Sequence, residues 1–128
     1  MHRTLSEWVV KRNGFYYQRT SDVPFTGTVS GTTEGSMTNG KREGEWRFYY
    51  KNKLWLKANY GSGKREGELV RYNKNGKLKS KGTYKNGKRD GPWVHYKVEG
   101  GFFKKLTGTF KNGKKVSDLP IRIRTPKK

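Results

Sequence analysis

The sequence predicts an all-β protein, an antiparallel meander of stacked β-hairpin repeats that together form one long ribbon. Three observations favour this fold class. Gly occurs 17 times and Ala once, a composition that disfavours helices. Asn-Gly pairs recur along the chain, and the segments between them alternate polar and apolar residues as strands do. Aromatic residues make up 14% of the chain, which is enough bulk for a small core.

The turn pairs belong to an internal repeat of about two dozen residues, and self-similarity at a fixed spacing is typical of repeat architectures. The sequence Gly-Lys-Arg or Gly-Lys-Lys begins each unit, with spacings of 23, 24 and 26 residues. The glycines that begin these units are Gly40, Gly63, Gly87 and Gly113.

These spacings divide the chain into three parts. Residues 1–39 are predicted to form an N-terminal cap with a degenerate repeat, 40–116 the repeat region, and 117–128 a basic C-terminal tail. The repeat region is divided into units 40–62, 63–86 and 87–112, followed by the start of a fourth.

The turns are expected in order along the chain, because Asn-Gly favours a two-residue turn with positive φ at both positions. Such pairs stand at 39–40, 75–76, 86–87 and 112–113, Ser62-Gly63 replaces one, and Asn52-Lys53 is a weaker candidate. A longer turn or bulge is expected near Gly100-Gly101, after which Phe102 and Leu106 are expected to continue the apolar row.

The strands between these turns are expected to have one apolar face. Ala58, Gly82 and Gly108 occupy the same repeat position on that face, where a larger residue would collide with a covering ring. We expect Trp46 and Trp93 to cover this position. A further aligned set is expected to pack in the core, with outward exposure as the alternative: Tyr49, Tyr72 and Tyr96.

These aligned residues resemble the MORN-repeat family, specifically its shorter bacterial variant. The resemblance rests on Gly44-Glu45-Trp46, on Gly67 to Tyr72 and above all on the segment from Gly87 to Tyr96. Leu69 stands where the other two units have Trp. The resemblance implies a ribbon of stacked hairpins without a catalytic centre, and bacterial members are often antitoxin or immunity partners of toxins.

Composition limits the function classes. The net charge of +20 favours a partner of opposite charge. The chain has no Cys and two His, so disulfides, thiolate chemistry and a histidine metal cluster are not expected. No secretory leader and no apolar run of transmembrane length is evident, so a cytoplasmic location is expected. No cofactor is expected.

A basic sheet face with interleaved aromatic residues is the strongest candidate binding site. Alternation in the segment 77–85 places lysines on one face, and neighbouring strands add further lysines if their registers agree. Such a surface suits phosphates of nucleic acid or anionic lipid, although lysines also keep sheet edges soluble. The candidate residues are Lys53, Trp55, Lys57, Lys77, Lys79, Lys81, Lys85, Lys105 and Lys111.

Catalytic readings are weaker. Glu43, Glu66 and Asp90 recur once per unit, whereas a catalytic pair is needed once, so we expect them to pair with adjacent Lys and Arg. His95 lacks an evident carboxylate or nucleophile partner and is expected to be incidental. The chain is therefore predicted not to be an enzyme.

Two functions remain open at this point. One is a protein-binding partner of the antitoxin or immunity kind, which the family resemblance suggests. The other is binding to nucleic acid or an anionic lipid surface, which the charge suggests. The end strands of a ribbon can pair edge to edge, so the sequence leaves the oligomeric state open.

Overall fold

The structure is a computed structural model that describes residues 2–3 and 9–118, and strands account for most of these residues. The predicted tail lies outside the described residues beyond position 118. The elements are β1 (His2–Arg3), β2 (Val9–Arg12), β3 (Phe15–Gln18), β4 (Gly27–Val29), β5 (Thr33–Thr38), β6 (Lys41–Tyr50), β7 (Lys53–Gly61), β8 (Lys64–Tyr72), β9 (Leu78–Lys85), β10 (Lys88–His95), the 3₁₀ helix η1 (Lys104–Leu106), β11 (Gly108–Lys111) and β12 (Lys114–Ser117).

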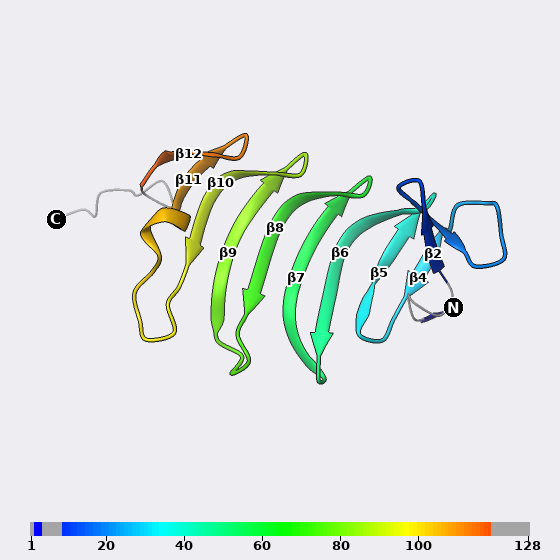
Figure 1. Cartoon of the computed structure of the whole chain (residues 1–128), viewed down its shortest axis with the longest axis horizontal. Coiled ribbons are helices and arrows are strands. Elements are labelled where there is room, and N and C mark those ends of the chain that lie inside the picture. Colours follow the sequence, from blue (N-terminus) through cyan, green and yellow to red (C-terminus); the bar gives the residue numbers. More distant parts are fainter. Residues whose placement is uncertain (1, 4–8, 119–128) are drawn as a thin grey trace, which may run out of the picture.

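Ten strands form one long sheet in the order β1-β4-β5-β6-β7-β8-β9-β10-β11-β12 (Figure 1). From β4 to β12 each strand pairs antiparallel with the next, which confirms the predicted meander. β1 is an exception because it pairs in parallel with β4. β2 and β3 form a separate hairpin. Within the described residues, no helix has the length and apolar character needed to cross a membrane.

The ribbon has two edges of different construction (Figure 1). One edge, which we call the turn edge, consists of the four tight turns 39–40, 62–63, 86–87 and 112–113. Both residues of each turn have positive φ, as the sequence predicts. The opposite edge, which we call the loop edge, consists of the connections that follow β6, β8 and β10.

Two turns on the loop edge differ from the prediction. Lys51 and Asn52 have φ values of 49° and 62°, so the first turn is centred one residue earlier than expected. At 75–76 the chain does reverse, but only Gly76 has positive φ. The Asn73 side chain accepts hydrogen bonds from the backbone N–H groups of Asn75 and Lys77. This local hydrogen bonding favours a longer turn than the predicted two-residue one.

The core lies on one face of the sheet, where tryptophan rings lie flat over neighbouring strands. A Cβ built on Gly82 would overlap the Trp93 ring, so the predicted cover is confirmed there. Trp46 instead covers Gly35, on the strand before its own. Gly108 is confined by the Ser117 carbonyl and not by a ring. Each indole therefore covers a glycine on the strand that precedes its own.

The core consists of two clusters. One contains Leu56, Ala58, Leu69, Trp93 and Phe110, and the other contains Val9, Val29, Met37 and Trp46. Phe48 and Tyr60 pack against both clusters. The expectation that Tyr49, Tyr72 and Tyr96 pack in the core is wrong, because none belongs to either cluster and Tyr96 is 40% exposed. Tyr49 and Tyr72 follow register shifts next to Phe48 and Arg71, which occupy the core-face position.

The connection from β10 to β11 also differs from the prediction. Lys97 and Gly101 close a turn through backbone hydrogen bonding, which agrees with the expected longer turn. Phe102 and Leu106, however, do not continue the apolar row. The chain forms η1 instead of a strand, and both side chains remain exposed, at 46% and 40%.

Candidate binding surfaces

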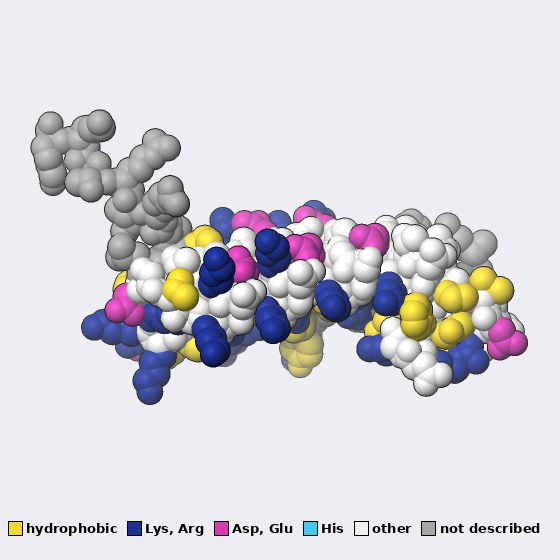
Figure 2. All heavy atoms as spheres, turned by 90° about the horizontal axis from the view of Figure 1, so that it is seen from above, with side chains coloured by type: hydrophobic (Ala, Val, Ile, Leu, Met, Phe, Trp, Pro, Cys, Tyr) yellow, Lys and Arg dark blue, Asp and Glu magenta, His cyan; other side chains and the backbone are white. Residues whose placement is uncertain are grey.

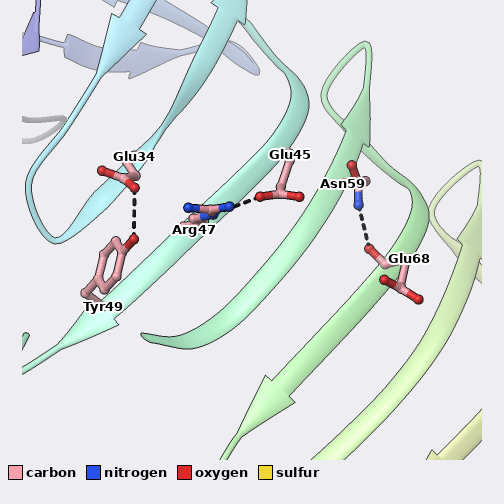
Figure 3. Close-up of polar contacts among 6 residues, drawn as sticks. All are labelled: Glu34, Glu45, Arg47, Tyr49, Asn59 and Glu68. Carbon is pink, nitrogen blue, oxygen red and sulfur yellow. Dashed lines mark hydrogen bonds and ion pairs between the residues drawn. The ribbon is translucent and has the colours of Figure 1, made fainter. Parts of the chain in front are cut away.

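The sheet face opposite the core contains acidic as well as basic side chains (Figure 3). Arg47 donates a hydrogen bond to Glu45 at 2.8 Å, and Lys81 lies 3.5 Å from a carboxylate oxygen of Glu68. The Tyr49 hydroxyl donates to Glu34 at 2.9 Å, which raises the pKa of Tyr49 above its usual value. These carboxylates reduce the positive potential of the central sheet face.

The structure does not bring the nine predicted binding residues together on this face. Lys57 and Lys81 both flank Val70 on the central strands. Lys53 and Lys77 belong to the loop edge, with Lys79 nearby at a register shift, whereas Lys85 and Lys111 flank tight turns of the turn edge. Lys105 lies in η1. The predicted basic face is thus divided mainly between two edges, and its binding role stays a prediction.

Trp55 lies near the loop edge and is 39% exposed, as the sequence suggests. The register between β6 and β7 shifts beside it, because Phe48 pairs with Leu56 and Tyr49 with Leu54. Its ring centroid is 6.2 Å from that of Phe48. Trp55 therefore packs partly against the rim of the core and does not stand alone between Lys53 and Lys57.

The turn edge carries a row of lysines along the length of the ribbon (Figure 2). Successive turns pack on one another, because a Cβ built on Gly63 would lie 3.4 Å from the Lys41 side chain, and one on Gly87 would lie 4.0 Å from that of Lys64. Turns two strands apart are separated by about 10 Å. The lysines of this edge are Lys41, Lys64, Lys85, Lys88, Lys111 and Lys114.

The repeated carboxylates anchor these turns. Glu43 accepts a hydrogen bond from the backbone N–H of Ser62 at 3.0 Å, and Glu66 accepts one from Asn86 at 2.9 Å. Asp90 accepts the equivalent bond from Asn112 at 3.2 Å. The predicted pairing with adjacent Lys and Arg is therefore replaced by a bond to the next turn. Spacing identified the repeated acids, but their acceptor role depends on contacts between units.

The arginines of the repeated Gly-Lys-Arg sequence cover the core aromatics. The guanidinium carbons of Arg42 and Arg89 lie 4.8 Å from the ring centroids of Trp46 and Trp93. Arg65 has no Trp in its unit and instead donates a hydrogen bond to the Tyr84 hydroxyl at 3.3 Å. These arginines serve mainly to pack the core face, so the turn edge depends on its lysines for accessible charge.

The loop edge combines exposed apolar side chains with lysines. Eight of the ten exposed large hydrophobic side chains in the described part of the chain belong to it: Tyr50, Trp55, Leu78, Tyr96, Val98, Phe102, Phe103 and Leu106. The exposed basic residues of the same edge are Lys51, Lys53, Lys74, Lys77, Lys97, Lys104 and Lys105, against one acid, Glu99. The sequence predicted some of these residues as binding residues, but it did not predict that they lie together on one edge.

The most concentrated part of the loop edge lies between β10 and β11. A shallow hollow of about 480 Å³ is lined by three apolar side chains, Phe102, Phe103 and Leu106, and three lysines. The Lys97 ammonium lies 5.6 Å from the Phe103 ring centroid. Cations over exposed rings produce a surface that is both basic and apolar.

His95 lies on the core face, with its ring stacked on Trp93 at a centroid distance of 5.6 Å. Burial, together with the positive charges of Arg89, Arg71 and Lys79, lowers its pKa to about 4. Its ring is therefore neutral at physiological pH. Within the described residues, no group of three or more His, Asp or Glu side chains is arranged to hold a metal ion.

The comparisons agree with this geometry. Residues 42–61 and 65–86 match the model of the MORN repeat variant. These two segments are MORN repeats. The matched segments fall within the first two predicted units, and the resemblance seen in the sequence is thereby confirmed, without its bacterial and antitoxin qualifiers. No curated protein and no solved structure matches the chain significantly. MORN repeats are generally protein- or membrane-binding repeats.

Proposed function

We propose that this MORN-repeat chain is a non-catalytic binding protein whose loop edge docks on an anionic lipid surface. The observation that carries the proposal is the coincidence, on one edge, of eight exposed large hydrophobic residues and a strong excess of lysines. Aromatic rings favour the interfacial region of a bilayer, and lysines are attracted to anionic headgroups. Stable attachment without a lipid anchor needs both contributions.

The charge on this edge supports an anionic surface in particular. Each lysine near such a surface contributes on the order of 1 kcal/mol, and the loop edge has seven lysines against Glu99. The anionic leaflet of a cell membrane faces the cytoplasm, so a cytoplasmic location is part of the proposal. On a neutral bilayer the lysines would contribute no electrostatic attraction, and only the apolar side chains would bind the protein to the surface.

The environment of the titratable residues supports a role without catalysis. Glu43, Glu66 and Asp90 are acceptors for backbone N–H groups of neighbouring turns. His95 is stacked on Trp93 among positive charges and not beside a carboxylate that would orient it as a base. The three carboxylates have structural partners that account for their presence, and the proposal includes no cofactor.

The proposal is tested by co-sedimentation with vesicles. The chain is expected to pellet with phosphatidylcholine vesicles that contain about a third phosphatidylserine, and to stay in solution with phosphatidylcholine alone. The double variant Phe102→Ser, Phe103→Ser removes two exposed rings and is expected to lose most of this binding. Val23→Ser is the control, because Val23 is 70% exposed but far from the loop edge. Equal binding by both variants would contradict the proposal.

A protein partner is the second candidate function, and one observation favours it. A recess of about 460 Å³ between β9, β10 and the following connection is lined mostly by apolar surface, including Pro92, Val94 and Tyr96. Apolar recesses with a few polar groups suit a partner's anchoring side chain. A toxin neutralised by this chain would fit that description, and the antitoxin role stays a prediction.

This alternative is separated from lipid binding by affinity purification from the source cell with nuclease and detergent added. A protein partner that contacts the recess remains bound under both treatments and is lost with Val94→Asp. A surface that binds lipid alone releases its material in detergent.

A further inference from the structure

The turn edge differs from the loop edge in one decisive respect, since it is basic but not apolar. None of the exposed large hydrophobic side chains found among the described residues belongs to its four turns. Its exposed residues are mainly lysines, glycines and short polar residues, with acidic side chains such as Glu66 beside them (Figure 2). The turns 62–63, 86–87 and 112–113 therefore offer no exposed ring on which a base could stack, whereas beside the turn 39–40 the Lys41 ammonium lies 4.6 Å from the half-buried Phe15 ring.

The lysines of this edge are held in a regular row. Each tight turn has both residues in the left-handed region, so the direction of the lysine that follows is fixed by the backbone. The turns are linked to one another, because the N–H groups of Gly63, Gly87 and Gly113 donate to the carbonyls of Arg42, Arg65 and Arg89 at 2.8–3.0 Å. The backbone positions of the lysine row are therefore fixed before any ligand binds.

The carboxylates beside the row reduce its charge without balancing it, since Glu43, Glu66 and Asp90 stand against six lysines. Glu66 and Asp90 each direct an oxygen at a backbone N–H of the next turn. A polar recess of about 480 Å³ lies between the turns 86–87 and 112–113. It is lined by Lys85, Lys88 and Lys111 together with Asp90 and two asparagines. Three lysines thus line the recess against one acid, which leaves a net positive charge there.

We propose that the turn edge is a second binding site, for the phosphate backbone of a nucleic-acid duplex. A single row of lysines about 10 Å apart suits a linear polyanion better than a planar one. Without exposed rings, the edge can contact phosphates but cannot stack unpaired bases, which favours a duplex over a single strand. Recognition at this edge is therefore independent of nucleotide sequence.

This site does not depend on the proposed membrane function, because the two edges lie at opposite ends of the strands. The central strands β6 to β10 have 8 to 10 residues. At about 3.3 Å per residue the two edges are roughly 25–30 Å apart. A duplex on the turn edge and a lipid surface on the loop edge can therefore be bound at the same time.

The test measures binding to a fluorescent 20-base-pair duplex by anisotropy between 50 and 200 mM salt. The triple variant Lys64→Gln, Lys88→Gln, Lys114→Gln is expected to bind at least about tenfold more weakly at 100 mM salt. It is also expected to reduce the slope of log K against log salt by about 2.7, the value for three lost phosphate contacts. Glutamine keeps the aliphatic stems that pack on the neighbouring turns.

The matched control is the triple variant Lys57→Gln, Lys79→Gln, Lys81→Gln. It removes the same number of positive charges at positions outside the turns of either edge, and it is expected to retain most of the affinity for the duplex. Equal losses in the two triple variants would mean that net charge alone drives binding, and would overturn the site. Tighter binding of a single strand than of the duplex would overturn it as well. Loss of vesicle binding in the turn-edge variant would assign that edge to lipid, whereas failure of the loop-edge variants bears on the proposed function alone.

Discussion

Individual glycine positions show how closely residue identity and packing are related in this ribbon. Gly82 is glycine because the Trp93 ring occupies the space where its Cβ would stand. Column alignment in the sequence predicted that relation, since the same position holds small residues in three units. The partner of Trp46 was predicted less well, because a column specifies that a ring covers a small residue but not on which neighbouring strand.

His95 makes folding stability depend on pH. Its pKa of about 4 in the folded chain is lower than the ordinary value near 6.5, because of burial and then Arg89, Arg71 and Lys79. Between these two pH values the unfolded chain binds more protons, so its contribution is complete above pH 6.5 and is lost as pH falls toward 4. Urea unfolding at pH 7 and pH 4.5 measures this loss.

The variant His95→Phe provides the comparison, because Phe48 occupies the same repeat position in another unit. We expect a smaller decrease in the urea midpoint between the two pH values for this variant than for the native chain. An identical decrease in both would show that other groups cause it. The sequence could not predict this environment, because Arg71 and Lys79 approach His95 only after β8, β9 and β10 pair.

The hairpin element was largely predictable, whereas the links between hairpins were not. Asn-Gly and Ser-Gly fixed the turn edge, because few residues adopt positive φ at adjacent positions. The bond from Asn86 to Glu66 joins two units, and its acceptor was expected to pair with basic neighbours. The register between β7 and β8 shifts near Gly67, whose φ is 98°, so the segment carrying Glu66 leaves regular pairing. Alternation along one strand does not reveal such a shift.

This link between turns can be measured in one unit. Glu66→Ala removes the acceptor of the Asn86 N–H and is expected to lower the free energy of unfolding by about 1 kcal/mol. The matched control is Glu68→Ala, whose exposed partner Lys81 lies 3.5 Å away and whose loss is expected to cost less than about 0.5 kcal/mol. Chemical denaturation of both variants gives the comparison. Equal effects would assign no special role to the repeated carboxylates.

At the scale of the whole molecule, the ribbon separates two kinds of basic surface. The net charge of +20 predicted an anionic partner, and the lysines of one strand suggested a binding face. The sequence predicted the location of the binding face less well than the sign of its charge. Lys77 and Lys85 lie at opposite ends of β9 and contribute to opposite edges. Exposure of Phe102 and Leu106 depends on η1, which the alternation pattern did not predict.

The orientation of the ribbon on a lipid surface tests the central claim most directly. The chain has no Cys, so a single thiol can carry an environment-sensitive dye. Val98→Cys places the dye on the loop edge, at a residue that is 86% exposed, and Lys111→Cys places it on the turn edge. With vesicles that contain phosphatidylserine, we expect a blue shift and enhanced emission from the dye at position 98 and no change at position 111. A blue shift at position 111, or none at either position, would contradict the account.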